Sequence, residues 1–232
     1  MGKKIQEEMR LITAEFFGTA FLTATVLILS GIFRGGTAPW YTAISAGATL
    51  AMLVGVFGNI SGAHVNPAVT VGLWTLKKIK TTKALLYILS QLLGAAAMLA
   101  LYNYVTDSRI LSAGASGIDA RVFVGEAVGA GIFGMGIIAA VHQKLEGFYK
   151  AFVIGASLTA GALFSLIATY PLLDRYPEIL DYTTGFINPA VALGNNVWDK
   201  TVVIAPIVGM VVGMNIYHYA FVKYAGKGAK KK

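Results

Sequence analysis

The sequence predicts an all-α membrane protein in which six helices cross the bilayer and two shorter helices enter it without crossing. Three observations support this fold class. Only 13% of the 232 residues are charged, about half the share in a typical soluble domain, and the mean hydropathy is +0.67. The apolar residues gather in six long runs. The tripeptide Asn-Pro-Ala occurs twice, each time beside a shorter apolar run.

Each of the six long runs can cross a membrane, because a spanning helix needs about 20 mostly apolar residues. They leave too few residues for a second soluble domain, so we expect a single membrane domain over residues 1–232. No secretory signal is evident before the first run. The expected spans are about 10–32, 41–58, 82–104, 121–142, 149–169 and 201–223.

The basic residues indicate how these spans are oriented. Fourteen of the 19 fall on one side of the predicted membrane, and the positive-inside rule places that side, with both termini, in the cytoplasm. We expect a multi-pass protein of the plasma membrane. The net charge of +8 does not favour nucleic-acid binding, because basic residues at membrane edges are attracted by anionic lipid of the bilayer. The cytoplasmic set is Lys3, Lys4, Arg10, Lys77, Lys78, Lys80, Lys83, Lys144, Lys150, Lys223, Lys227, Lys230, Lys231 and Lys232, and the opposite set is Arg34, Arg109, Arg121, Arg175 and Lys200.

Little in the sequence points to catalysis or metal binding. Cysteine is absent, which excludes disulfides, thiolate metal sites and cysteine nucleophiles. His142 and His218 lie near the ends of different spans and do not form a metal-binding pattern. No nucleophile and base are recognisable as a pair. We therefore expect no enzyme activity, no metal and no cofactor.

The chain consists of two related halves. The segment AEFFGTAFLT, which contains Glu15, resembles GEAVGAGIFG, which contains Glu126, and HVNPAVTVG resembles FINPAVALG. Each half has three spans, so the second half must enter the membrane from the opposite side. This predicts an inverted 3+3 repeat, with repeat 1 at about 10–104 and repeat 2 at about 121–223. In such repeats the functional site lies near the midplane. A polar stretch near 170–182 lengthens the second half, as an enlarged extracellular loop at the pore mouth or as a plain surface loop.

The two Asn-Pro-Ala motifs predict half-helices. Asn is a favoured N-cap, and Pro suits the first helical position because the N–H that it lacks has no helical partner there. Each following segment extends for about ten residues, or roughly 15 Å, which is half of the hydrocarbon core. Two half-helices from opposite sides would therefore meet at the centre. The motif residues are Asn66, Pro67 and Ala68 in the first half and Asn188, Pro189 and Ala190 in the second.

The meeting point suits a channel for neutral solutes. Two helix N-termini direct unpaired N–H groups and positive dipole ends toward it, and the Asn amides can donate hydrogen bonds to a passing water or hydroxyl group. Positive ends also repel cations. One Asn-Pro-Ala is weak evidence and is typical of an ordinary helix start. Two copies in matched contexts are strong evidence for a pair of half-helices that form a pore.

The segments AEFFGT, SGAHVNPAVT, GFINPAVALG and PIVG resemble those of the aquaporin and glycerol-facilitator family over essentially the whole chain. The resemblance implies a homotetramer with a pore in each protomer. It also implies that Glu15 and Glu126 accept hydrogen bonds from the half-helix loops, although a buried membrane carboxylate can instead relay protons. His64, two residues before Asn66, is expected to line the cytoplasmic half of the pore, or else to pack locally.

The family usually has an arginine after the second Asn-Pro-Ala, at the narrowest constriction, and this chain has Val191 there. The other constriction positions correspond to Ala46, Gly185 and Ala162, with Gly161 as the alternative to Ala162. All are small or apolar. We therefore expect a wide filter for water and small neutral solutes, with glycerol and other polyols, urea, ammonia and uncharged metalloid acids as candidates.

Two other functions are compatible with the sequence. Coupled secondary transporters also use inverted repeats and broken helices, and Glu15 and Glu126 are available to bind a coupling ion. A closed, structural or junctional membrane protein would explain the missing arginine and the long loop. Solute flux distinguishes all three.

Overall fold

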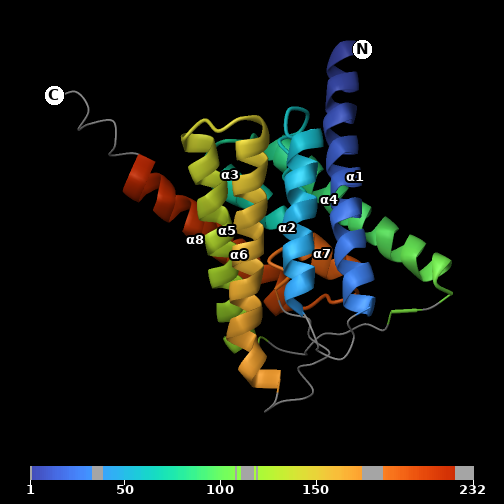
Figure 1. Cartoon of the computed structure of the whole chain (residues 1–232). Coiled ribbons are helices and arrows are strands. Elements are labelled where there is room, and N and C mark those ends of the chain that lie inside the picture. Colours follow the sequence, from blue (N-terminus) through green and yellow to red (C-terminus); the bar gives the residue numbers. More distant parts are fainter. Residues whose placement is uncertain are drawn as a thin grey trace.

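The computed structural model describes residues 2–32, 39–107, 109–110, 118, 120–173 and 185–222. Long helices dominate these ranges (Figure 1). The helices are α1 (Gly2–Ile32), α2 (Pro39–Phe57), α3 (Pro67–Thr75), α4 (Thr81–Val105), α5 (Ala120–His142), α6 (Gly147–Leu173), α7 (Pro189–Gly194) and α8 (Lys200–Tyr217), the last of which continues as a π-helical turn η2 (His218–Val222).

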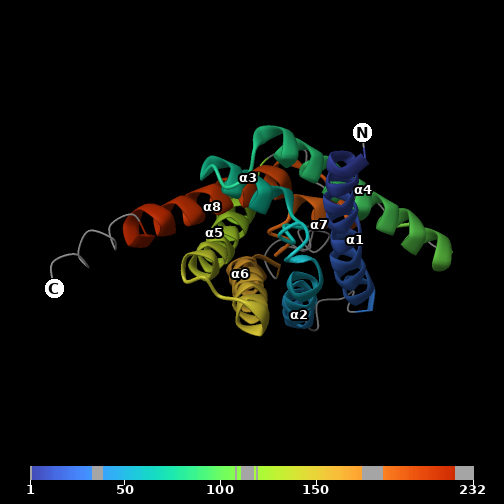
Figure 2. The same cartoon turned by 90° about the horizontal axis from the view of Figure 1, so that it is seen from above.

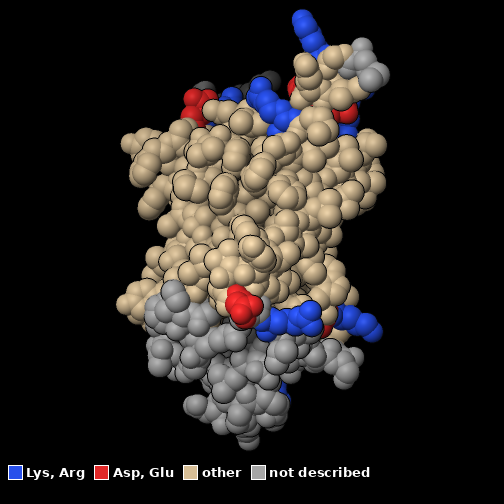
Figure 3. All heavy atoms as spheres, turned by 90° about the vertical axis from the view of Figure 1, so that its right-hand side faces the viewer, with Lys and Arg blue, Asp and Glu red and all other residues tan. Residues whose placement is uncertain are grey.

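Six of these helices are long and apolar enough to cross a membrane, which confirms the predicted spans. On the face shown in Figure 3, Lys, Arg, Asp and Glu gather at the two ends of the molecule and leave a broad band free of charge. Helix α1 begins at Gly2, eight residues before the expected span at about residue 10. Hydropathy marks only the apolar part of a helix, whereas Lys, Gln and Glu are good helix formers that continue it toward solvent.

Four helix pairs build the framework. Within the first half α1 packs on α4, and within the second half α5 packs on both α8 and α6. Helix α2 packs on α6 and joins the halves (Figures 1 and 2). Glycines allow these close approaches. A Cβ on Gly94 would collide with the carbonyl of Phe16, and one on Gly209 would collide with that of Ala127. The small residues Gly94 and Gly209 therefore serve contacts within one protomer.

The half-helices lie between these pairs, with α3 packed against α8 and α4, and α7 against α4 and α1. Helix α3 has 9 residues, close to the expected ten, but α7 has only 6. At the end of α7 the N–H of Asn196 donates to the carbonyl of Leu193 at 2.9 Å and that of Val197 to the carbonyl of Ala192 at 3.0 Å, while the Asn195 side-chain amide donates to the carbonyl of Val191 at 2.8 Å. Asn196 then takes a left-handed conformation, φ 58°, in which a helix cannot continue.

Several expectations lie outside the described residues. These are most of the long stretch near 170–182, of which 174–182 are not described, the basic residues Arg34 and Arg175, and the tail lysines Lys223, Lys227, Lys230, Lys231 and Lys232.

Candidate functional site: the paired asparagines and the cavity beside them

Asn66 and Asn188 cap the half-helices in the same way. The Asn66 side chain accepts a hydrogen bond from the N–H of Ala68 at 2.8 Å, and Asn188 accepts one from Ala190 at 3.0 Å. A proline occupies the first helical position in both cases. Both asparagines are 2% exposed. The two caps therefore bring the N-termini of α3 and α7 together in the interior.

The Asn side chains also join the two halves of the chain. The Nδ2 of Asn66 donates to the carbonyl of Ile187 at 3.0 Å, and the Nδ2 of Asn188 donates to the carbonyl of Val65 at 3.0 Å. The sequence predicted that these amides donate to a passing solute. An amide group carries two N–H donors, so one N–H of each asparagine is used by the opposite loop, and the second has no hydrogen-bond partner among the described residues.

The acceptor residues Val65 and Ile187 have left-handed backbones, with φ of 41° and 39°. This conformation is rare for β-branched residues because it strains the backbone by about 1–3 kcal/mol per residue. It persists only where surrounding contacts impose it. Its effect is to direct the two carbonyl oxygens across the centre, where the asparagines bind them. The strain is thus a direct part of how the halves are joined.

Glu15 supplies one set of those contacts. Its carboxylate, fully buried, accepts from the backbone N–H groups of His64 at 3.0 Å and Val65 at 2.7 Å. The Ser61 hydroxyl donates to it at 2.6 Å and the Gln91 amide at 2.7 Å. Every partner in the described part of the chain is a donor, so the carboxylate acts as an acceptor throughout.

Glu126 holds the second loop in an equivalent manner. It accepts from the backbone N–H groups of Gly185, Phe186 and Ile187, the last at 2.7 Å, and from the Ser165 hydroxyl at 3.2 Å. It is also fully buried. Both glutamates therefore bind the residue that precedes an Asn-Pro-Ala motif. The difference is that Glu126 binds three backbone N–H groups and Glu15 binds two.

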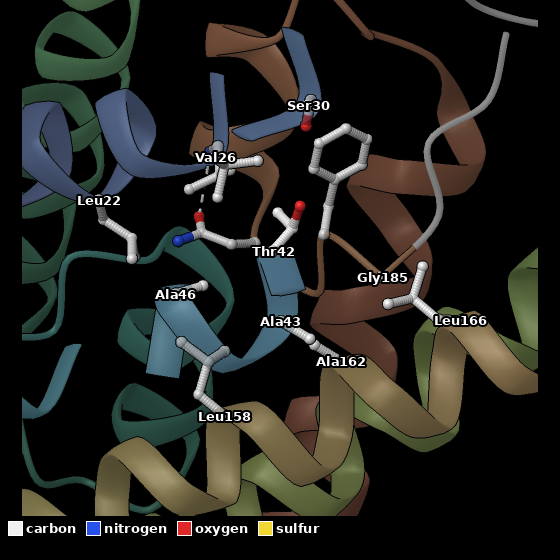
Figure 4. A pocket seen from close by; sticks show the side chains of 13 residues that line it. Leu22, Val26, Ser30, Thr42, Ala43, Ala46, Leu158, Ala162, Leu166 and Gly185 are labelled. Atoms are coloured by element: carbon white, nitrogen blue, oxygen red, sulfur yellow. Dashed lines mark hydrogen bonds between the residues drawn. The ribbon is translucent and has the colours of Figure 1, made fainter. Parts of the chain in front are cut away.

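A cavity opens on one side of the paired asparagines (Figure 4). It has about 60 Å³ of space for water-sized molecules, enough for several waters. The four constriction residues expected from the sequence, Ala46, Ala162, Gly185 and Val191, all line it, together with Asn188. The alternative position, Gly161, packs against the backbone of Gly129 in another direction.

The cavity has side chains that the sequence did not indicate. Leu158 and Leu166 of α6 form an apolar wall on either side of the expected Ala162, whereas Ser30 at the end of α1 and Thr42 at the start of α2 contribute hydroxyls (Figure 4). Neither hydroxyl has a hydrogen-bond partner within the described ranges. Their helical positions carry no recognisable motif, so only the packing of α1, α2 and α6 could reveal them.

His64 lies outside this cavity, on the loop that leads into α3. Its Nδ1 is 3.2 Å from the Thr70 hydroxyl, and its ring meets the edge of Tyr87 at a centroid distance of 5.2 Å. No cluster of three or more His, Asp or Glu side chains that could hold a metal occurs among the described residues. Two α4 side chains hold this loop: Gln91 donates to Glu15, and Tyr87 donates to the carbonyl of Ser61. The sequence did not predict either contact.

The profile of the family described as Major intrinsic protein matches residues 3–217. The chain belongs to the major intrinsic protein family. It is a passive membrane channel for water and small solutes, and not an enzyme. The match extends from the first turn of α1 to the last residue of α8, so it includes both half-helices and every cavity residue.

Similarity to individual members of the major intrinsic protein family extends over most of the chain. Aquaporin AqpM of Methanothermobacter thermautotrophicus is 30% identical, covering 89% of this chain and 95% of that protein. The lens fiber major intrinsic protein of Rattus norvegicus is 33% identical, covering 90% and 80%. The X-ray structure of the aquaglyceroporin from Plasmodium falciparum has a TM-score of 0.71 at 22% identity, covering 95% and 99%, which confirms the fold.

Proposed function

We propose that this channel conducts water together with small neutral solutes larger than water, such as glycerol and urea, through a filter without arginine. The observation that carries the proposal is the position of Val191, whose side chain lines the cavity next to Ala46, Ala162 and Gly185. An arginine at this position would extend a long cationic side chain into the same space. Valine leaves that space open to a solute with several non-hydrogen atoms.

The cavity chemistry supports neutral solutes. Among the described lining residues none is charged, so an ion that enters exchanges its hydration for mostly apolar contacts, which is strongly unfavourable. A neutral solute needs only a few hydrogen bonds. Ser30 and Thr42 provide two hydroxyls without a partner among the described residues, and Asn188 provides its second amide N–H beyond them. Ammonia and uncharged metalloid acids meet the same requirements.

We propose that Glu15 and Glu126 act as structural supports for the half-helix loops and not as a proton relay. The support for this role is that all eight described hydrogen bonds to the two carboxylates come from donors, five of which are backbone N–H groups of the loops. We also propose that His64 lines the cytoplasmic half of the pore. We further propose that residues 1–232 form a single domain, that the protein is a homotetramer of the plasma membrane, and that both termini lie in the cytoplasm.

Solute flux through proteoliposomes tests the wide filter. Water, glycerol and urea permeability are measured for the native protein, for Val191→Arg and for Val191→Met, which lengthens the side chain without adding charge. We expect the native channel to pass all three solutes, and Val191→Arg to reduce glycerol and urea flux more than water flux and more than Val191→Met does. Native protein that passes water but excludes glycerol and urea would contradict the proposal.

The same assay separates the rival functions. Flux that saturates and follows an imposed proton or sodium gradient would indicate a coupled transporter. A correctly inserted protein without flux of any solute would indicate a closed structural member of the family. A solute range that is unchanged in Val191→Arg would show that Val191 does not form the constriction.

A further inference from the structure

Lys83 carries a positive charge that the tertiary structure holds in one place. It lies in the first turn of α4, is half-buried, and has its ammonium group 5.2 Å from the centre of the Tyr87 ring. This is within the range of a cation–π interaction. Tyr87 is itself fixed, because it is 1% exposed and its hydroxyl donates to the carbonyl of Ser61 at 2.8 Å. Lys83 therefore differs from a freely moving surface lysine.

This charge is close to the loop that leads into α3. The His64 ring lies 5.2 Å from the Tyr87 ring on a centroid basis, and Lys83 lies 5.2 Å from the same ring. Two steps of 5.2 Å put the ammonium at most 10.4 Å from the centre of the His64 ring. Lys83 is thus an electrostatic neighbour of the first half-helix loop.

The first loop also contains an acceptor group that attracts cations. The Glu15 carboxyl group accepts the N–H of His64 at 3.0 Å, so its electronegative oxygens attract a cation at this level of the pore. The repeat alignment places Trp198 of the second half opposite Lys83, and Val202 opposite Tyr87. The filter has Val191 where the family usually has arginine.

We propose that Lys83, held on Tyr87, is a charge-selectivity residue that opposes cations on the His64 side of the paired asparagines. The inference rests on the proposed path past His64 and the asparagines. The positive side chain that repels cations would then lie at the end of the pore opposite to the position where the family usually has its filter arginine. The half-helix dipoles act together with it at the centre.

Coulomb's law gives the size of the effect. Two unit charges about 10 Å apart, at an effective dielectric constant of about 20, interact strongly enough to change the local population of a cation roughly tenfold. Removal of the Lys83 charge is therefore expected to raise cation or proton leakage about tenfold. Water carries no net charge and its permeability is expected to stay the same. The ratio of proton to water permeability is the quantity that isolates the effect.

The test measures proton flux under an imposed pH gradient and water flux by osmotic shrinkage in the same proteoliposomes. Lys83→Met is expected to raise the proton-to-water ratio about tenfold, and Lys83→Arg to keep it low, because arginine retains the charge and stacks on an aromatic ring. Lys80→Met is the matched control, since Lys80 is exposed and immediately precedes α4. An unchanged ratio in Lys83→Met, or an equal rise in Lys80→Met, would overturn the proposal.

Glycerol flux in these vesicles separates this inference from the proposed filter. If the native protein excludes glycerol while Lys83→Met still raises the proton-to-water ratio, the wide filter is wrong and the role of Lys83 stands. If the native protein passes glycerol and the ratio does not change, the filter stands and the role of Lys83 is wrong.

Discussion

Removal of the Glu126 side chain is expected to damage the channel more than removal of Glu15, although both carboxylates are fully buried. In Glu126→Ala, the backbone N–H groups of Gly185, Phe186 and Ile187 lose their acceptor. A backbone N–H in a fixed loop cannot move to a new partner. An unsatisfied buried donor destabilises by about 1–3 kcal/mol, so three of them amount to about 3–9 kcal/mol.

In Glu15→Ala only two backbone N–H groups, those of His64 and Val65, lose their acceptor. The other two donors are side chains. Gln91 already donates to Thr70 at 3.0 Å, so it keeps a partner. The expected loss is about 2–6 kcal/mol. Both variants remove one buried carboxylate from a spanning helix, so the free-energy change from that removal is shared and cancels in the comparison. The remaining difference in stability is the cost of one unsatisfied backbone N–H, about 1–3 kcal/mol.

Thermal unfolding of the purified protein in detergent measures this difference. One kcal/mol corresponds to about 2–4 °C in a chain of this size, so Glu126→Ala is expected to unfold about 2–12 °C below Glu15→Ala. Thr19→Ala is the matched control on α1, because the buried Thr19 hydroxyl has no partner in the described part of the chain. Glu15→Ala unfolding at the same temperature as Glu126→Ala, or lower, would refute the counting of backbone donors.

Three further outcomes follow from other parts of the structure. Gly209→Ala is expected to destabilise the protein by about 1–3 kcal/mol or more because its Cβ would collide with the Ala127 carbonyl, whereas Gly55→Ala, with open space around it, should unfold at or above the native temperature. Asp199→Ala removes the side chain that caps α8 and is expected to lower stability by about 1 kcal/mol in the same unfolding assay; no change would show that the cap is dispensable. Because the chain has no cysteine, mercurials are expected not to block water flux through a thiol, and inhibition reversed by a reducing agent would contradict this.

Much of the architecture could be predicted because a bilayer imposes simple requirements. A helix that crosses about 30 Å of hydrocarbon needs a long apolar run, and the six runs were found on that basis. Asn-Pro is a local signal for a helix start, so Asn66 and Asn188 were placed at the ends of α3 and α7 correctly. The length of α7 was wrong, because Asn195 and Asn196 end it through side-chain and backbone contacts that apolar patterning does not show.

The parts of the site that could not be predicted depend on residues far apart in the chain. The bond from Asn66 to the Ile187 carbonyl joins residues 121 positions apart. The left-handed backbone of Ile187 that it uses is contrary to the preference of a β-branched residue. Likewise, Ser30 and Thr42 became cavity residues only through helix packing.

The sequence by itself determined the membrane class, the inverted repeat and the two half-helices, because each depends on local composition or on an internal comparison. The tertiary structure alone decided how the asparagines share their donors, which hydroxyls line the cavity, and where the charge of Lys83 rests. These depend on distances between helices, which arise when all of the spans pack against one another and each buried polar group finds a partner.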